Sequence, residues 1–290
     1  MTGGSTSDLR VAVLGLGPMG APIARNLAAA GFPLSVWNRT RSRGEAFADV
    51  AEVPAEPAEV RADVVLSVLP DVDQLDQVAP DPVLASWAAA GTDVLMVLST
   101  TSPQRVHDLA ARAAAVGIEV VDAPMSGGDR GAREGTLSIM VGGSDAAVAR
   151  VTPVLHAIGR RVVHMGALGA GAVAKLCNQL VVGATLAALG EALGLAHHAG
   201  LDEGALLEVL GTGLAGSAAL DLKREKLLAR DYPVGGSADN QLKDLRYAEQ
   251  VAAELGARTP LLDLVTALYT EAVDRGLGDQ DHSVIRELFD

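Results

Sequence analysis

A glycine-rich turn near the start of the chain constrains the fold most. It follows the apolar run Leu9–Leu14, opens an alanine-rich segment that runs to about Ala30, and consists of Gly15, Leu16, Gly17, Pro18, Met19 and Gly20. In a strand–turn–helix unit the first glycine allows the tight turn, the second lets the backbone approach a pyrophosphate, and the third lets helix and strand pack. The turn therefore predicts a doubly wound α/β domain that binds a dinucleotide. A glycine-rich turn without a ligand is the alternative.

Apolar runs alternate with helical stretches through the first half of the chain. Because the runs show no polar alternation, they predict a parallel sheet with helices on both faces. The expected strands are Leu9–Leu14, Leu34–Trp37, Val64–Leu69, Val94–Leu98 and Ile118–Asp122, and Leu137–Val141 and Arg161–Met165 are expected to extend the sheet.

No convincing strand follows Gly171, and the pattern becomes helical. A chain of 290 residues favours two domains. We expect a dinucleotide-binding Rossmann domain over residues 1–167 and an all-helical domain over residues 168–290, joined by one long helix. The expected helices are Ala172–Ala199, Asp202–Gly211, Ala218–Arg230, Asn240–Glu254 and Thr259–Asp274.

The charge balance limits the partners. Acidic residues number 36 against 23 basic ones, a formal net charge of -13, which disfavours nucleic acid or membrane as the main partner. The single cysteine, Cys177, excludes an intramolecular disulfide and a cysteine-based zinc site. The six histidines lack metal-ligand spacing, so no metal is predicted.

No targeting signal is visible in the sequence. Met1–Ser7 is polar and glycine-rich and predicts a frayed tail. Leu180–Leu189 is the most membrane-like stretch, at roughly half of the ~20 apolar residues that span a bilayer. We therefore expect a cytoplasmic protein.

The end of the second strand discriminates between cofactors. An NAD site usually carries Asp or Glu about 20 residues past the glycine turn, but this strand ends in Asn38, Arg39, Thr40 and Arg41. The Arg39 guanidinium suits a 2′-phosphate, with Asn38 and Thr40 as further donors. NADP(H) is thus favoured over NAD(H); a solvated basic turn is the alternative.

Two further segments end strands at the edge where doubly wound sheets bind ligands. Leu69-Pro70-Asp71 follows the third strand, and Ser99-Thr100-Thr101 follows the fourth. Leu69, Pro70 and Thr100 are therefore candidate cofactor contacts. Turn formation and helix capping explain the same residues equally well.

A lysine in an otherwise apolar helix is a candidate catalytic group. Lys175 is surrounded in sequence by Ala, Val and Leu, where a lysine is costly unless it is used or paired to a carboxylate. Gln179 lies four residues later on the same helix face and can orient a substrate. Ser126, Gly127 and Gly128 offer a hydroxyl and unhindered amides for a substrate carboxylate, although a simple turn at a strand end is the alternative.

Several motifs in order give the chain a family resemblance. With the glycine turn, they are Asp122–Gly128 (DAPMSGG), Gly135–Gly143 (GTLSIMVGG), Gly169–Gln179 (GAGAVAKLCNQ), Leu242–Leu245 (LKDL) and Gly276–Asp281 (GLGDQD). This set resembles the β-hydroxyacid dehydrogenase family, which includes 3-hydroxyisobutyrate dehydrogenases and tartronate semialdehyde reductases.

The resemblance implies roles for particular residues. Lys175 would be the general acid/base, Lys243 would close over the nicotinamide, and Asn178, Gln179 and Asp244 would contact the substrate. The family also implies a homodimer or homotetramer. Two departures affect the pocket. Gln179 stands where the family often has Asn, which keeps the carboxamide but adds a methylene. Gly236 stands where the family often has a bulky residue, which predicts an enlarged or looser pocket.

The predicted function is NADP(H)-linked interconversion of a small 3-hydroxy acid and its semialdehyde or oxo acid. An imine reductase is the nearest alternative, because that related family shares the GLGPMG turn and the WNRT strand end. It generally lacks the SGG segment and carries a different proton donor at the lysine position. A non-catalytic dinucleotide-binding module is the alternative of another class.

Overall fold

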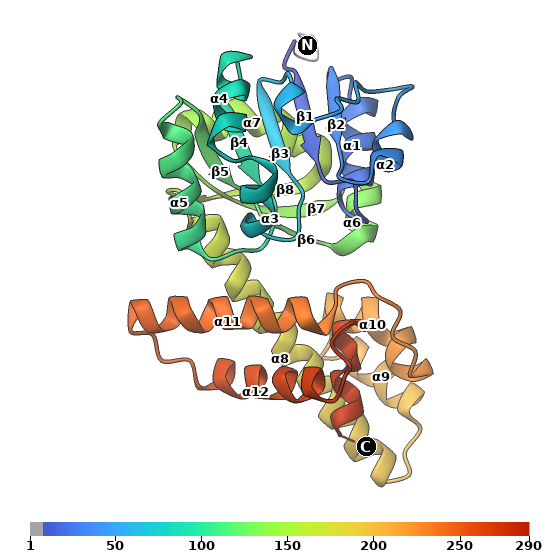
Figure 1. Ribbon diagram of the computed structural model, residues 1–290. Coiled ribbons are helices and arrows are strands. Elements are labelled where there is room, and N and C mark those ends of the chain that lie inside the picture. Colours follow the sequence, from blue (N-terminus) through green and yellow to red (C-terminus); the bar gives the residue numbers. More distant parts are fainter. Residues whose placement is uncertain (1–7, 290) are drawn as a thin grey trace, which may run out of the picture. The chain divides into compact units, whose positions relative to one another are not determined.

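A computed structural model describes residues 8–289 of the chain (Figure 1), so the predicted tail Met1–Ser7 lies outside the described residues. The chain divides into two units, the first ending at Lys175 and the second beginning at Leu176. The fold class expected from the sequence is confirmed: a parallel-dominated Rossmann sheet is followed by a helical unit.

The first unit is built on an eight-stranded sheet with the strand order β2-β1-β3-β4-β5-β7-β6, and β8 pairs with β7. Neighbours among the first five strands are parallel, as predicted. The strands are β1 (Val11–Leu14), β2 (Leu34–Trp37), β3 (Val64–Ser67), β4 (Val94–Val97), β5 (Glu119–Asp122), β6 (Met125–Ser126), β7 (Leu137–Gly142) and β8 (Gly159–Gly166).

Two helical layers enclose this sheet, and successive strand residues face opposite layers. Val11 and Val13 share a buried cluster with Ile23 of α1, whereas Ala12 shares another with Trp87 of α4. Burial on both faces explains why the strands lack polar alternation. The helices are α1 (Gly20–Ala29), α2 (Arg41–Glu45), η1 (Pro57–Glu59), α3 (Val72–Val78), α4 (Asp81–Ala89), α5 (Pro103–Ala114), α6 (Gly128–Glu134) and α7 (Asp145–Ile158).

The far side of the sheet departs from the expected parallel pattern. The short strand β6 was not predicted, and β7 runs antiparallel to both β5 and β6. After β5 the chain turns back through β6 and the seven-residue helix α6, so β7 returns in the opposite direction. The helix α7 then crosses over to β8, which is parallel to β7.

The second unit is helical, with one buried cluster that includes Leu186, Leu245 and Tyr269. Helices α11 and α12 lie side by side in it (Figure 1). A closing 3-10 helix, η2, was not predicted. The elements are α8 (Ala170–His198), which begins in the first unit, α9 (Glu203–Thr212), α10 (Ala218–Ala229), α11 (Ala238–Leu255), α12 (Pro260–Asp274) and η2 (His282–Leu288).

Helix α8 is long and apolar enough to cross a membrane by length and composition alone. In its most apolar window, 44% of the residues are buried inside the protein. Core helices of soluble proteins meet the same test, so this helix is weak support for a membrane span.

Candidate functional site

The three glycines of the turn have different surroundings. Gly15 has a φ of 95°, which favours glycine. A Cβ on Gly20 would lie 1.8 Å from the carbonyl oxygen of Gly15, so that position requires close packing. A Cβ on Gly17 would meet nothing within 4 Å. The middle glycine thus faces open space next to the first turn of α1, a cradle that fits a dinucleotide phosphate.

The end of β2 holds this turn in place. The Gly15 amide donates to the Trp37 carbonyl at 2.9 Å. The Leu16 amide donates to Oδ1 of Asn38 at 2.9 Å, and Nδ2 of Asn38 donates to the Thr40 carbonyl at 3.0 Å. In this structure Asn38 therefore shapes the turn. Because β1 lies between β2 and β3, the turn sits where the strand order reverses, which is the usual ligand site of such sheets.

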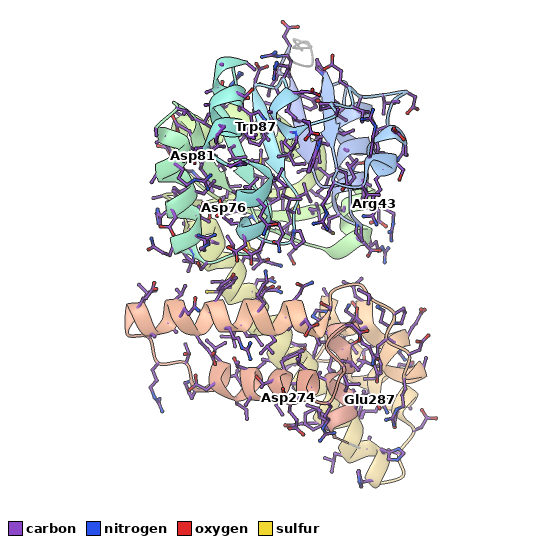
Figure 2. The ribbon with its side chains drawn as sticks, in the orientation of Figure 1. Arg43, Asp76, Asp81, Trp87, Asp274 and Glu287 are labelled. Carbon is purple, nitrogen blue, oxygen red and sulfur yellow. The ribbon has the colours of Figure 1, made fainter. Side chains whose placement is uncertain are left out.

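A cavity of about 250 Å³ adjoins the end of β2. Arg39 is exposed and makes no hydrogen bond or ion pair within residues 8–289, whereas Arg41 pairs with Glu45 at 2.9 Å. Arg43 of α2 is also exposed but does not line this cavity (Figure 2). The cavity is lined by Trp37, Asn38, Arg39, Arg41, Gly44, Val53, Pro54, Ala55 and Glu56. The arrangement leaves the Arg39 guanidinium available for an anion.

The segments after β3 and β4 combine capping with unsatisfied hydroxyls. Asp71 caps α3 by accepting from the Val72 amide, and Ser102 caps α5 by accepting from the Arg105 amide. In contrast, the hydroxyls of Ser67, Ser99 and Thr101 are buried without a hydrogen-bond partner among the described residues. The predicted contact residues Leu69 and Thr100 are half-buried, and Pro70 is exposed. Unsatisfied buried hydroxyls at this edge fit a bound polar ligand; Ser67 was not predicted.

The Ser126–Gly128 segment forms β6 and the start of α6. Ser126 is half-buried, and both glycines are exposed with positive φ, 129° at Gly127 and 60° at Gly128. A Cβ on Gly128 would meet nothing within 4 Å. Both backbone conformations favour glycine. The space beside Gly128 is open, whereas a Cβ on Gly127 would lie 3.3 Å from the Leu137 side chain.

Lys175 lies in the second turn of α8 and is 8% exposed. The first turn is held by Asp122 at the end of β5, whose carboxylate accepts from the Gly169 amide at 2.8 Å and the Ala172 amide at 2.7 Å. Burial raises the pKa of Asp122, which the two amides only partly offset. The role of Asp122 was not predicted, although an acid ending a buried strand was visible in the sequence.

In the second unit the structure brings together four of the predicted residues. Gln179 Nε2 donates to Asp244 Oδ2 at 2.8 Å, and Asn178 Nδ2 donates to Gln179 Oε1 at 3.0 Å. Lys243 Nζ lies 3.3 Å from Asp244 Oδ1. Asp244 is only 5% exposed, so these side chains form its immediate surroundings. Gln241 also joins this cluster and was not predicted.

The loop that carries Gly236 is flanked by an unpredicted charge cluster. Asp281 is fully buried and accepts from Lys223 at 2.7 Å and Lys226 at 2.8 Å. Burial alone would raise the pKa of Asp281, but the two lysines outweigh it and hold that pKa well below its ordinary value. A Cβ on Gly235 would lie 2.9 Å from Asp281 Oδ2, whereas one on Gly236 would meet nothing within 4 Å.

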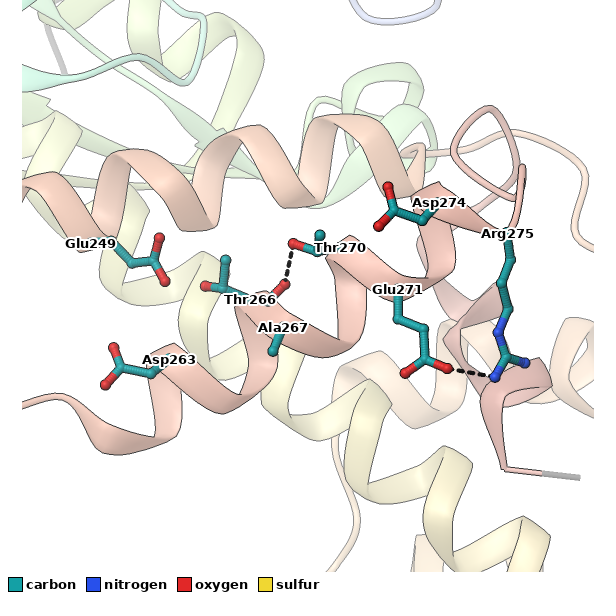
Figure 3. A pocket seen from close by; sticks show the side chains of 8 residues that line it. All are labelled: Glu249, Asp263, Thr266, Ala267, Thr270, Glu271, Asp274 and Arg275. Atoms are coloured by element: carbon teal, nitrogen blue, oxygen red, sulfur yellow. Dashed lines mark hydrogen bonds and ion pairs between the residues drawn. The ribbon is translucent and has the colours of Figure 1, made fainter.

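A wider acidic groove of about 550 Å³ lies along α12 and contains none of the predicted site residues (Figure 3). Thr270 donates to the Thr266 carbonyl, and Arg275 pairs with Glu271. The groove is lined by Glu249, Asp263, Thr266, Ala267, Thr270, Glu271, Asp274 and Arg275. No group of three or more potential metal ligands occurs in the part of the chain that the structure describes.

Two family models cover almost the whole chain. Residues 10–166 match the NAD binding domain of 6-phosphogluconate dehydrogenase. Residues 169–289 match the NAD-binding domain of NADP-dependent 3-hydroxyisobutyrate dehydrogenase.

Individual proteins match over similar lengths. A 3-hydroxyisobutyrate dehydrogenase of Pseudomonas aeruginosa is 36% identical over 96% of this chain and 98% of its own. An NAD-dependent L-serine dehydrogenase of the same organism is 35% identical over 97% and 98%. The solved structure of Mycobacterium tuberculosis 3-hydroxyisobutyrate dehydrogenase with L-serine is 30% identical, with a TM-score of 0.83 over 97% and 99%. An imine reductase from Myxococcus stipitatus, at 20% identity, TM-score 0.66 and 97% and 99% coverage, shares the fold alone.

Proposed function

The chain belongs to the β-hydroxyacid dehydrogenase family, and from that premise we propose that it interconverts a small 3-hydroxyisobutyrate-like acid and its semialdehyde with NADP(H). It is an oxidoreductase of the CH–OH group of hydroxy acids and uses a nicotinamide dinucleotide. The preference for NADP(H), the particular acid and the residue roles below are the proposal.

The placement of Lys175 carries the proposal. Oxidation of an alcohol removes a hydride from carbon and a proton from oxygen, and the bound nicotinamide supplies the hydride acceptor. The hydroxyl proton needs a base, and in the reverse direction the new alkoxide needs an acid. Lys175 is nearly buried, and Asp122 holds the helix turn before it. Its amine takes the proton during oxidation, and its ammonium returns it during reduction.

Separate groups bind the rest of the substrate. The Ser126 hydroxyl and the backbone amides of Gly127 and Gly128 bind the carboxylate, and the open space beside Gly128 gives it room to approach. Asn178, Gln179 and Asp244 would contact the substrate and Lys243 would contact the nicotinamide, as the family resemblance implies. The open space at Gly236 accommodates a substrate larger than the smallest aldehydes.

The cofactor preference rests on the end of β2. No acid occupies the strand tip where NAD enzymes usually bind the ribose hydroxyls. Arg39 lines a cavity there and is not engaged by an acid within residues 8–289. A guanidinium forms paired hydrogen bonds with a 2′-phosphate. Arg39, assisted by Asn38 and Thr40, therefore selects NADP(H), and the glycine turn with Leu69, Pro70 and Thr100 contacts the rest of the cofactor.

The assembly and location of the enzyme are also proposed. Several large apolar side chains of the second unit are strongly exposed: Val181, Leu195, Val209 and Leu255 are between 64% and 74% accessible. Such surface favours association with other copies, which supports a homodimer or homotetramer. The proposed cytoplasmic location rests on the similarity to bacterial dehydrogenases.

A spectrophotometric screen tests this function. NADP+ and NADPH, each beside its NAD counterpart, are combined with hydroxy acids, semialdehydes and cyclic imines. We expect turnover of hydroxy acids with NADP+ and of semialdehydes with NADPH, and much slower turnover with the NAD forms. Reduction of cyclic imines alone would favour an imine reductase, and cofactor binding without any turnover would favour a non-catalytic module.

A further inference from the structure

The direction of the Gln241 side chain is fixed by a backbone group. Gln241, on α11, is 1% exposed, and its Nε2 donates to the backbone carbonyl of Gln179 at 2.9 Å. A carbonyl oxygen only accepts hydrogen bonds. The NH2 end of Gln241 must therefore face this carbonyl, and its Oε1 must face the opposite way.

The orientation of Gln241 in turn fixes the orientation of the Gln179 carboxamide. Oε1 of Gln241 lies 3.3 Å from Nε2 of Gln179 and 3.2 Å from Nδ1 of His282. Nε2 of Gln179 also donates to the Asp244 carboxylate at 2.8 Å. Reversing the Gln179 amide would place its oxygen against an amide oxygen and a carboxylate, and both contacts would be repulsive. Both N–H groups of Gln179 are thus committed inside the protein.

The remaining polar atom of Gln179 can only accept. Oε1 already accepts from Asn178 Nδ2 at 3.0 Å, and a carbonyl oxygen has a second lone pair. Gln179 is half-buried, whereas Gln241 is closed off from solvent. A ligand that reaches Gln179 therefore meets an acceptor.

We propose that Gln241 is a positioning residue that holds the Gln179 carboxamide with its oxygen toward the substrate. Position 179 then recognises a hydrogen-bond donor, a hydroxyl or an ammonium group near the reacting carbon, and does not bind the substrate carboxylate. The inference rests on the proposed function, which assigns Gln179 to the substrate site. It adds a specificity-determining residue that never touches the substrate.

A double-mutant cycle tests this coupling. Gln241→Met keeps the approximate volume but removes both polar ends, and Gln179→Met does the same at the substrate position. The loss of one positioned hydrogen bond should raise the KM for the hydroxy acid about 3- to 10-fold in each single variant, with kcat within about twofold and the KM for NADP+ unchanged. Because Gln241 acts through Gln179, the double variant should be no worse than Gln179→Met.

A second variant tests the polarity separately from packing. Gln241→Glu has the shape of glutamine, and only its protonated form can donate to the Gln179 carbonyl. The KM of this variant should therefore rise with pH beyond the change seen in the wild type. A mere packing role predicts no such added pH dependence, because both protonation states have the same shape.

Tyr232→Phe serves as the control, because it removes another partly buried side-chain hydrogen bond of the same unit, from Tyr232 to Glu287. Its KM should match the wild type. The proposal would be overturned if the KM increases of the two single variants multiplied in the double variant, or if a folded Gln241→Met variant had an unchanged KM. If the wild type oxidises hydroxy acids and Lys175→Ala does not, either of these results rejects the role of Gln241 and leaves the proposed function standing. If the wild type turns over no hydroxy acid, the proposed function is rejected together with the role of Gln241.

Discussion

Oδ2 of Asp122 lies 2.7 Å from the backbone nitrogen of Ala172 and joins the end of β5 to the first turn of α8. Lys175 follows Ala172 by three residues, so the strand fixes the start of the helix that carries the proposed acid/base. Gly142 and Gly171 leave room for this carboxylate, since a Cβ on either would lie within 3 Å of its oxygens.

Replacing Asp122 should therefore destabilise the protein. Asp122→Ala leaves the Gly169 and Ala172 amides without their acceptor, and each unsatisfied buried donor costs about 1–3 kcal/mol. We expect the free energy of unfolding to fall by at least about 2 kcal/mol in urea titrations followed by circular dichroism. Glu119→Ala, at the exposed start of the same strand, removes only an exposed hydrogen bond from Ser144 and should change it by no more than about 1 kcal/mol. Equal effects would disprove the capping role.

Two alanine substitutions in the glycine turn should separate folding from cofactor binding. Gly20→Ala places a methyl group 1.8 Å from the Gly15 carbonyl and should lower the melting temperature. Gly17→Ala meets no protein atom and should leave the melting temperature unchanged. Its methyl group occupies the phosphate cradle, so the Kd for NADPH should rise about tenfold or more. Tight NADPH binding by a stable Gly17→Ala protein would place the phosphates elsewhere.

The cofactor preference should depend on Arg39. Arg39→Ala removes charge-assisted hydrogen bonds worth about 1.5–3 kcal/mol, so the Kd for NADPH should rise about 10- to 150-fold. NADH lacks the 2′-phosphate, and its Kd should change little. Arg43→Ala is the control, because Arg43 is an exposed arginine of the neighbouring helix α2 that does not line the cavity. Equal losses for NADPH and NADH, measured by fluorescence titration, would contradict the assignment.

The buried Asp281 cluster should make stability depend on acid pH. Its two lysine partners hold the pKa of Asp281 below its unfolded value despite burial. Its contribution is therefore complete above about pH 4 and is lost progressively as the pH falls toward the folded pKa. Asp281→Asn should cost about 3–5 kcal/mol near pH 7 and less at pH 3.5.

The matched control for this pH series is Asp274→Asn, which changes an exposed carboxylate of the same unit (Figure 2). Its free energy of unfolding should follow that of the wild type at both pH values. A cost of Asp281→Asn that stays constant between pH 7 and pH 3.5 would show that the charge of Asp281 is not what stabilises the cluster.

Much of the fold was predictable because its signals are local. Apolar strands, the glycine turn and the periodic helices each occupy a continuous stretch of sequence. The direction of β7 was not predictable, since a six-residue apolar strand reads the same in parallel and antiparallel pairing.

The site could be predicted only in part for a related reason. Lys175 stands out because its neighbours in the sequence are apolar. The contacts of Asp122 with Ala172 and of Gln179 with Gln241 join residues 50 and 62 positions apart. Contacts between residues so far apart depend on how helices and strands pack, and a local sequence pattern does not predict them.

The role of Lys175 is the central claim, and one measurement tests it most directly. The rate of NADPH formation from the best hydroxy acid is compared between the wild type and Lys175→Ala, with the Kd for NADP+ measured on both proteins. A positioned acid/base contributes about 10²- to 10⁴-fold, so kcat should fall by that factor while the Kd stays the same. Equal rates for the two proteins would contradict the proposed mechanism.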